Sequence, residues 1–256
     1  MKAVILAAGQ GVRLRPLTFS LPKCLVEVGG KSFLQNQLEI LEKAGLEECV
    51  LVLGYYAELV VKRFGTQFGS MRITYVQNPR YYETNNLYSL WMARNEIEDD
   101  ILLIESDLIF RYELIEGVLN NSYPNIAVTD KFQNGMDGTV VFEKDGIINS
   151  MVLKANQSKA FDYSNARKTV NIYRFDRIVV SNMLIPQLTK FVQLGRVNEF
   201  YESVLADMIT GKKLVICSHE VGDQPWFEID NLQDLKQAER LFDSLDGSTE
   251  SEAIKF

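Results

Sequence analysis

A small-residue loop near the N-terminus, followed by cations, is the part of the sequence best suited to chemistry. The apolar run Ala3–Leu6 leads into Ala7-Ala8-Gly9-Gln10-Gly11, and the cations behind it are Arg13, Arg15 and Lys23. Glycines allow positive φ and bring backbone N–H groups close to an anion, because no Cβ holds the phosphates away. Such a loop with cations behind it indicates a site for a triphosphate.

Two better-known phosphate loops do not fit these residues. The dinucleotide-binding pattern needs a third glycine where this chain has Leu14. A Walker A loop ending at Gly30-Lys31-Ser32 would need a glycine where this chain has Leu25. We therefore expect neither a dinucleotide-binding loop nor a P-loop.

The segment from Leu6 to Leu25 fits a longer pattern, Leu-Ala-Ala-Gly-x-Gly-x-Arg-Leu-x-Pro-Leu-Thr followed by Pro-Lys-x-Leu. This pattern resembles the signature of the nucleotidyltransferases that activate sugar phosphates and phospho-alcohols with nucleoside triphosphates. The resemblance makes Arg13 and Lys23 the candidate catalytic residues, with Arg13 on the outer phosphates and Lys23 on the α-phosphate. It implies that the nucleotide is bound by Leu6, Ala7, Ala8, Gly9 and Gly11.

Acidic residues at two predicted strand ends are candidate metal ligands. An apolar strand that ends in acids delivers them to the carboxyl edge of a sheet, and Asp107 follows such a strand. Glu228 and Asp230 are two residues apart, which places them on one face of an extended segment. Mg²⁺ prefers carboxylate oxygens and keeps several waters, so we predict Mg²⁺ as cofactor, bound by Asp107, Glu228 and Asp230. Taken alone, Asp230 is equally suited to cap the following helix, and Glu105 is left outside the metal set.

Three later segments resemble one branch of this superfamily, the cytidylyltransferases that activate phosphocholine or 2-aminoethylphosphonate. These segments are Asn78–Trp91, Lys168–Tyr173 and Trp226–Leu235. The resemblance implies that CTP and a small phosphonate or phosphorylated amine react to give a CDP-activated product and pyrophosphate. We rank 2-aminoethylphosphonate first, then phosphocholine, then a phosphorylated amino acid such as phosphoglutamine. The same resemblance places Asn85, Tyr88 and Ser89 at the pyrimidine.

The acceptor pocket is predicted from chemistry. A cationic headgroup favours carboxylates and aromatic faces, the latter through cation–π attraction worth roughly 0.5–2 kcal/mol, and lysines suit the acceptor's phosphate or phosphonate. The candidate acceptor-binding residues are Lys154, Lys168, Glu199, Tyr201 and Trp226, with Glu202 beside them. The competing interpretation is an ordinary amphipathic helix, in which Phe200, Val204 and Leu205 are buried while Glu199 and Glu202 face solvent.

The elements that must position these residues alternate between strand and helix in the first half of the chain. We predict strands at 3–6, 49–53, 72–76 and 101–105, and helices at 33–44, 57–64 and 87–95. Such alternation favours βαβ crossovers. With the family resemblance, it predicts a Rossmann-like three-layer α/β fold around a mixed, mostly parallel central sheet.

From about residue 122 strand-like segments follow one another. We predict strands at 126–130, 138–143, 147–153 and 169–175, helices at 178–193 and 198–209, a strand at 213–217 and a helix at 231–242. We expect one domain over 1–245, with a nucleotide-binding part at about 1–120 and an acceptor-binding part at about 121–245. Residues 246–256 are expected to be a flexible tail.

Composition argues against several classes of protein. The net charge of −7 and the lack of a basic block argue against a nucleic-acid binder. Three cysteines and one histidine cannot form a common Cys/His zinc site. No apolar run approaches the roughly 18–20 residues that a membrane span needs, and we expect a cytoplasmic protein with reduced thiols and no membrane partner.

Two alternative functions remain open at this point. One is a hexose-1-phosphate nucleotidyltransferase that uses TTP or UTP, and the other is a non-catalytic nucleotide-binding module. The presence of Arg13, Lys23, Asp107 and Asp230 favours an enzyme over the binding module. The sequence does not indicate the oligomeric state.

Overall fold

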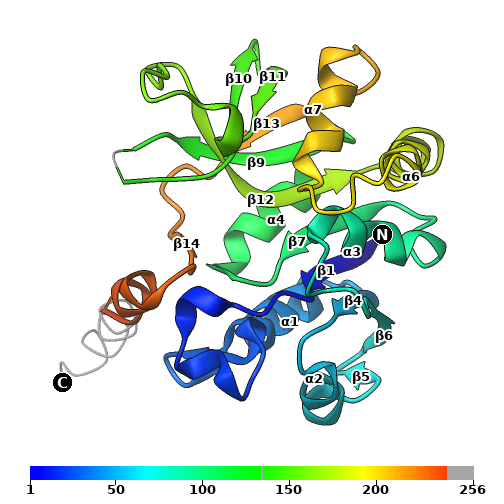
Figure 1. Cartoon of the computed structure of the whole chain (residues 1–256), viewed down its shortest axis with the longest axis vertical. Coiled ribbons are helices and arrows are strands. Elements are labelled where there is room, and N and C mark those ends of the chain that lie inside the picture. The colour runs from blue at the N-terminus through cyan, green and yellow to red at the C-terminus, as the bar shows by residue number, and fades with distance from the viewer. Residues whose placement is uncertain (134, 241–256) are drawn as a thin grey trace, which may run out of the picture.

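Strand β1 (Lys2–Ala7) occupies the middle of a parallel group of four strands. The computed structural model describes residues 1–133 and 135–240 (Figure 1). The group has the order β7-β1-β4-β6, with β4 at Glu48–Leu53, β6 at Met71–Gln77 and β7 at Ile101–Glu105. β1, β4 and β7 are nearly continuous apolar runs because both faces of the sheet are covered.

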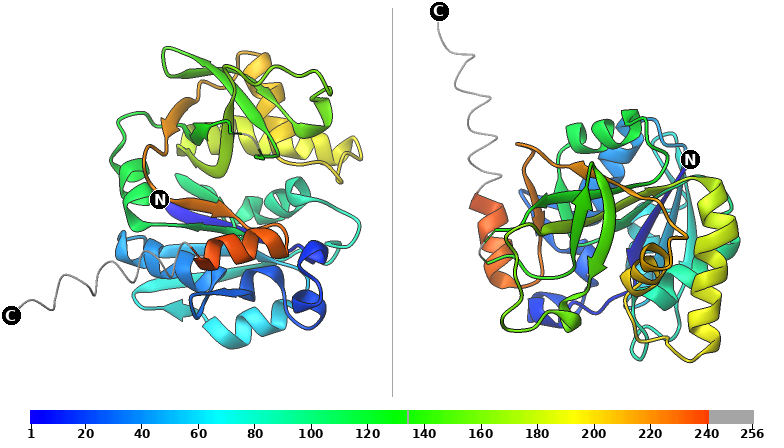
Figure 2. Two further views of the ribbon diagram at one scale, coloured as in Figure 1. Left: turned by 90° about the vertical axis from the view of Figure 1, so that its left-hand side faces the viewer. Right: turned by 90° about the horizontal axis from the view of Figure 1, so that it is seen from above.

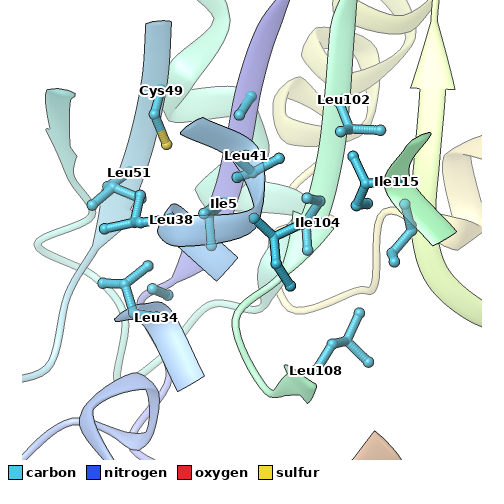
Figure 3. Packing of buried hydrophobic residues seen from close by; sticks show 14 of the residues in the cluster. Ile5, Leu34, Leu38, Leu41, Cys49, Leu51, Leu102, Ile104, Leu108 and Ile115 are labelled. Atoms are coloured by element: carbon cyan, nitrogen blue, oxygen red, sulfur yellow. The ribbon is translucent and has the colours of Figure 1, made fainter. Parts of the chain in front are cut away.

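Alternate residues of β1 contribute to two hydrophobic clusters on opposite faces of the sheet. Ala3 and Ile5 pack with α1 (Phe33–Lys43), α2 (Ala57–Phe64) and α4 (Tyr112–Asn120). Val4 and Leu6 pack with α3 (Asn86–Met92) and with helices of the second half. Figure 3 shows Leu34, Leu38 and Leu41 of α1 beside Ile5 and Leu51. The sheet with a helical layer on each side gives the three predicted layers.

The second half of the chain extends the same sheet through β12 (Arg167–Phe175), which pairs antiparallel with β7. Its other strands are β9 (Ile126–Lys131), β10 (Val140–Lys144), β11 (Ile147–Val152) and β13 (Cys217–Glu220). The order β10-β11-β13-β9-β12 closes through a β10–β12 pairing, which makes a small mixed barrel. Its helices are α5 (Arg177–Val179), α6 (Ile185–Gln193) and α7 (Glu202–Thr210), with a π-helical segment (Val180–Leu184) between the first two. Figure 2 shows this half stacked on the parallel half.

A two-stranded pairing links the C-terminal segment to the first half. β8 (Leu108–Phe110) pairs antiparallel with β14 (Trp226–Glu228), so that Glu228 lies opposite Leu108. The backbone N–H of Ile229 then donates to the carbonyl oxygen of Asp107 at 3.0 Å. This register places the residues just after β14 beside those just after β7.

The structure corrects part of the predicted fold. The ten-stranded sheet is mixed but not mostly parallel: among the described residues, four of its pairings are parallel and six are antiparallel. Apolar runs indicate burial and not strand direction, so the antiparallel half could not be separated from the parallel half. The predicted strand at 213–217 is also wrong, because β13 begins at Cys217.

Smaller differences concern helices and chain ends. The helix expected from residue 198 begins at Glu202, and α4 was not predicted. Residues 232–240 are helical as expected, whereas the end of that helix and the tail at 246–256 lie outside the described residues. In the described residues, no helix is both long enough and apolar enough to cross a membrane. Cys24, Cys49 and Cys217 are free and buried.

Candidate active site

A pocket of about 290 Å³ lies at the carboxyl ends of β1 and β7, where ligands of open α/β sheets bind. Segments that are far apart in sequence line it. They include the signature loop (Ala7–Gly11), the residues between β6 and the start of α3, the end of β7, Phe200, and Asp230 after β14. The predicted site residues that line it are Leu6, Ala7, Ala8, Gly9, Gly11, Arg13, Lys23, Asn85, Ser89, Asp107 and Asp230. The fold therefore brings most of the predicted nucleotide and phosphate contacts to one place.

Gly11 gives the signature loop its shape. Its φ of +60° is in the left-handed region that favours glycine, and the Thr18 hydroxyl donates to its carbonyl oxygen at 2.8 Å. A Cβ at Gly11 would lie 2.8 Å from the Cβ of Lys23. The glycine is needed both for the turn and for the close passage of Lys23.

Lys23 lies between two carboxylates on the wall of the pocket. Its Nζ donates to Asp107 Oδ2 at 2.7 Å and to Asp230 Oδ1 at 2.9 Å, and Arg13 reaches the same Asp230 oxygen at 2.7 Å. Burial lowers the pKa of Lys23, but the charges and hydrogen bonds of the two carboxylates outweigh it and raise that pKa overall. Burial raises the pKa of Asp230, but Lys23 and Arg13 outweigh it and lower that pKa overall. Lys23 and Asp230 are therefore both charged at neutral pH.

Two of the three predicted metal ligands lie together. Asp107 and Asp230 share Lys23, and among the described residues nothing hydrogen-bonds the buried Oδ1 of Asp107. Glu228 is held elsewhere, 3.0 Å from Lys168 Nζ and accepting from Asn171 Nδ2 at 3.0 Å. In residues 1–133 and 135–240, no group of three His, Cys, Asp or Glu side chains is arranged to hold a metal. Two carboxylates fit Mg²⁺, which keeps several of its waters.

The three residues predicted at the pyrimidine lie at the start of α3. The Asn85 side chain accepts from the backbone N–H of Asn86 at 2.8 Å, and Ser89 Oγ accepts from Asn78 Nδ2 at 3.1 Å. Both Asn85 and Ser89 line the pocket. Tyr88 does not line it: its ring is buried, with the Arg80 guanidinium 5.2 Å from the ring centroid.

Several pocket residues were not among the predicted site residues. Asn86 donates to Glu105 Oε1 at 2.7 Å and accepts from the backbone N–H of Tyr201 at 2.9 Å. Asn78, the first residue after β6, also lines the pocket. A polar residue directly after a buried parallel strand is a recognisable signal for Asn78, because it marks the ligand-binding edge. No comparable local signal marks Asn86.

The predicted acceptor residues fall into two groups. Lys168 is 2% exposed, and its Nζ lies 6.0 Å from the ring centroid of Trp226, whose Nε1 donates to Asp130 Oδ2 at 2.8 Å. Tyr201 is fully buried. Lys168 and Tyr201 therefore lie in the interior of the second half, whereas Trp226 is half-buried in β14.

The other two candidates lie at the surface, paired with neighbours. Lys154 pairs with Asp137 at 2.6 Å, and Glu199 pairs with Arg196 through two hydrogen bonds of 2.5 and 2.8 Å. Neither lines the pocket.

The interpretation of the segment around residue 200 as an ordinary amphipathic helix is only half right. Val204 and Leu205 are buried as it requires. Phe200, however, is 51% exposed at the pocket, and Glu202 is buried instead of facing solvent. The exposed aromatic and the buried acid are the reverse of what that interpretation expects.

Comparison with known proteins gives the family of the chain. A profile of the family described as nucleotidyl transferase matches residues 2–243. The chain belongs to the nucleotidyl transferase family. It is therefore an enzyme that transfers a nucleotidyl group from a nucleoside triphosphate to a phosphorylated acceptor, and the non-catalytic module is set aside.

Two relatives and one solved structure are similar to this nucleotidyl transferase over most of its length. CMP-5'-(3-aminopropyl)phosphonate synthase of Streptomyces rubellomurinus is 30% identical over 94% of this chain, which spans only 39% of that longer relative. Choline-phosphate cytidylyltransferase of Streptococcus pneumoniae is 26% identical over 94% of this chain and 98% of its own. A solved structure of CTP:phosphocholine cytidylyltransferase from Streptococcus pneumoniae has a TM-score of 0.75 at 23% identity, covering 94% of this chain and 98% of that one. At that identity the solved structure shows a shared fold.

Proposed function

We propose that this enzyme is a CTP-dependent cytidylyltransferase that joins CMP to a small phosphonate or phosphorylated acceptor bearing an amine. The convergence of Lys23, Asp107 and Asp230 at one pocket carries the proposal, because a half-buried cation beside two carboxylates suits the reaction of a triphosphate. The choice of CTP and of an amine-bearing acceptor is supported by the names of the relatives above. Among acceptors, 2-aminoethylphosphonate ranks first, then phosphocholine, then a phosphoglutamine-like compound.

In this reaction the protein must position the two substrates and neutralise the negative charge of the phosphates. An acceptor oxygen attacks the α-phosphorus of CTP in line, and the bond from that phosphorus to pyrophosphate breaks. A phosphate or phosphonate oxygen is already ionised near neutral pH, so neither a general base nor a protein nucleophile is needed. Lys23, held by two carboxylates at the pocket wall, supplies a fixed positive charge for the charge that develops at the α-phosphate. Arg13 suits the outer phosphates because its guanidinium binds phosphate oxygens in pairs.

Asp107 and Asp230 are the residues that would hold Mg²⁺. The unpartnered Oδ1 of Asp107 is the donor that carries this assignment, since a buried carboxylate oxygen without a partner is costly unless a ligand satisfies it. When bound there, the ion would neutralise the triphosphate and the leaving pyrophosphate. Because Lys23 contacts both carboxylates, Asp107 and Asp230 already lie close together before a metal ion binds.

The first test is pyrophosphate release in the presence of Mg²⁺, with each of the four nucleoside triphosphates and a panel of acceptors. The panel holds 2-aminoethylphosphonate, phosphocholine, phosphoethanolamine, phosphoglutamine and glucose-1-phosphate. We expect release with CTP and at least one amine-bearing acceptor. Release only with glucose-1-phosphate and TTP or UTP would replace the proposal by a hexose-1-phosphate nucleotidyltransferase.

A further inference from the structure

Three acidic side chains lie at and behind the pocket, and we call Glu105, Glu202 and Glu228 the carboxylate cluster. Glu202 is buried, and the other two are half-buried. They come from three elements: Glu105 ends β7, Glu202 begins α7 and Glu228 ends β14. Glu105 accepts a hydrogen bond from Asn86 Nδ2 at 2.7 Å, and Glu228 accepts one from Asn171 Nδ2 at 3.0 Å. The cluster therefore gathers three carboxyl groups where access to water is limited.

The cluster has fewer cations than carboxylates. Lys168 pairs with Glu228 at 3.0 Å and also donates to the carbonyl oxygen of Thr169 at 2.6 Å. Among the residues that the structure describes, Glu105 and Glu202 have no ion pair. Buried carboxylates are ordinarily paired with cations. The cluster could therefore bind one further cation, which the described residues do not supply.

Unsatisfied hydrogen-bond acceptors accompany this charge. Glu202 is 5% exposed and Tyr173 and Tyr201 are 0% exposed. In the described part of the chain, no group hydrogen-bonds Glu202 Oε2 or either tyrosine hydroxyl oxygen. The two tyrosine rings are in contact, with centroids 5.7 Å apart and planes at 89°. Buried polar atoms without partners are rare and costly, which points to a ligand that donates hydrogen bonds.

The cluster adjoins the pocket through Glu105 and Asn86, both of which line it. The Asn86 side chain joins the two regions directly, because it donates to Glu105 Oε1 and accepts from the backbone N–H of Tyr201. Glu202 and the two tyrosines do not line the pocket themselves, so an ammonium group would reach them beyond Glu105 and Asn86. Lys23 at the pocket and the carboxylate cluster behind it suit a small molecule that carries an anion at one end and a cation at the other.

We propose that Glu202, together with the hydroxyls of Tyr173 and Tyr201, binds the acceptor's ammonium group and selects a primary ammonium over a trimethylammonium. The inference rests on the proposed function and deepens it, since it names the class of amine. A primary ammonium has three N–H donors for the unsatisfied oxygens, as a lysine has. A trimethylammonium has no donor and would leave those oxygens buried without partners.

The aromatic residues of this region support the same choice. Trimethylammonium groups are recognised by the faces of aromatic rings. Here the Tyr173 and Tyr201 rings meet edge to face, and the ring of Trp226 has Lys168 Nζ as its nearby cation. Tyr173 and Tyr201 therefore present hydroxyl oxygens and not open ring faces to an acceptor, and the exposed aromatic ring of Phe200 belongs to the pocket itself.

The test compares two matched pairs of acceptors that differ only in N-methylation. These pairs are 2-aminoethylphosphonate against its N-trimethyl analogue, and phosphoethanolamine against phosphocholine, each with CTP and Mg²⁺. We expect kcat/KM to favour the primary amine by at least about 100-fold, because sites built to hydrogen-bond a group strongly reject analogues that lack the donor. Equal or better turnover of the trimethylated member of both pairs would overturn the inference and leave the cytidylyltransferase proposal standing.

A substitution separates recognition from a structural role. Glu202→Gln keeps the size of the side chain and removes its charge, so we expect KM for the primary amine to rise about tenfold or more while KM for CTP stays unchanged. The preference for the primary amine should shrink correspondingly. The matched control is Glu58→Gln, on the exposed face of α2, which should change neither constant.

The remaining outcomes are also decisive. A Glu202→Gln enzyme with unchanged acceptor KM, or with equal losses for CTP and for both kinds of amine, would overturn the assignment of Glu202 to amine recognition. If that variant does not fold, the matched acceptor pairs decide with the wild-type enzyme alone. If no amine-bearing acceptor supports pyrophosphate release from CTP, the proposed function fails and the inference fails with it.

Discussion

At the signature end of the pocket the charged side chains are paired, whereas at the acceptor end only Glu228 has an ion-pair partner, Lys168. Lys23 lies between Asp107 and Asp230, within 2.9 Å of both. Glu105 and Glu202 lack an ion pair among the described residues, and Glu202 keeps an unpartnered oxygen. One pocket thus joins a region of satisfied charge to a region of unsatisfied charge.

This difference suggests a different task for each end. The paired end is organised before substrate arrives, which suits a region that must present fixed charge to a reacting phosphate. At the acceptor end, the carboxyl groups without an ion pair destabilise the free protein. A ligand that carries a positive charge and hydrogen-bond donors would remove this destabilisation. Local conflicts of this kind are expected at functional sites. The predictions below test each end separately.

The largest effect is expected for Lys23→Ala. The substitution removes the fixed cation and leaves the Asp107 and Asp230 carboxylates without their shared partner, so turnover should fall by about 10³-fold. The measurement is single-turnover pyrophosphate release at saturating CTP, with the far-UV circular dichroism spectrum as the check on folding. Lys31→Ala is the control, since Lys31 forms an exposed ion pair with Glu39. Near-normal turnover of a folded Lys23→Ala enzyme would refute its placement at the reacting phosphate.

A smaller loss is expected for Asp107→Asn. The amide keeps the shape of the side chain but weakens its interaction with Lys23 and with a divalent cation, so turnover should fall by about 100-fold. The Mg²⁺ concentration for half-maximal rate should rise as well, and Mn²⁺ binding followed by paramagnetic resonance gives a readout without turnover. Asp99→Asn is the control, because Asp99 lies near the N-terminus of the chain, 3.9 Å from the Met1 amino group. An unchanged Mg²⁺ requirement would remove Asp107 from the metal site.

Gly11→Ala and Gly29→Ala form a matched pair at the signature end. Both glycines have positive φ, +60° and +57°, so either alanine should cost about 1–2 kcal/mol of stability. Only at Gly11 does the added Cβ meet a neighbour, at 2.8 Å from the Cβ of Lys23. We therefore expect a larger loss in the urea midpoint for Gly11→Ala than for Gly29→Ala, and about tenfold lower turnover for Gly11→Ala alone. Equal activity of the two variants would show that the position of Lys23 does not depend on Gly11.

The signature end could be predicted from sequence because its information is local. The loop, Arg13 and Lys23 fall within one short pattern, and the strand before Asp107 is a plain apolar run. The pairing of Asp107 with Asp230 was predicted as shared chemistry, but the contact depends on β8 and β14, which have three residues each. Such short strands carry no periodicity that a sequence can reveal.

The acceptor end depends on tertiary structure that the sequence does not display. Glu202 looks like a solvated residue at the start of an amphipathic helix, yet α7 turns it inward beside Glu105 and Glu228. The direction of β12 relative to β7 is likewise set by the long connection between them. Helix α4 was missed, and it has Gly117 in its interior, which weakens a helical pattern. Lys168 and Tyr201 were named from chemistry, and the structure puts both in the interior.

The last prediction concerns the stability cost of the Glu202 carboxyl group at the acceptor end. Burial above all raises the pKa of Glu202 to about 7 from its ordinary 4.5. The folded protein thus binds this proton more tightly than the unfolded chain, and the group's contribution to stability is lost as pH rises from about 4.5 to 7. Glu202→Gln removes that loss, so the variant should exceed the wild type in free energy of unfolding by about 3 kcal/mol more at pH 8 than at pH 4.

Urea unfolding at the two pH values measures this difference, with Glu58→Gln as the exposed control that should show none. A pH-independent difference for Glu202→Gln would mean that Glu202 carries no unfavourable buried charge, and the contrast between the two ends would disappear. If Glu202→Gln is more stable than the wild type at pH 8 and also loses its preference for the primary amine, the contrast between the two ends is supported. The Glu202 carboxylate would then lower the stability of the free protein and would be stabilised only by an ammonium group beside it. That is expected for a residue that selects its substrate through an ion pair which the free protein does not supply.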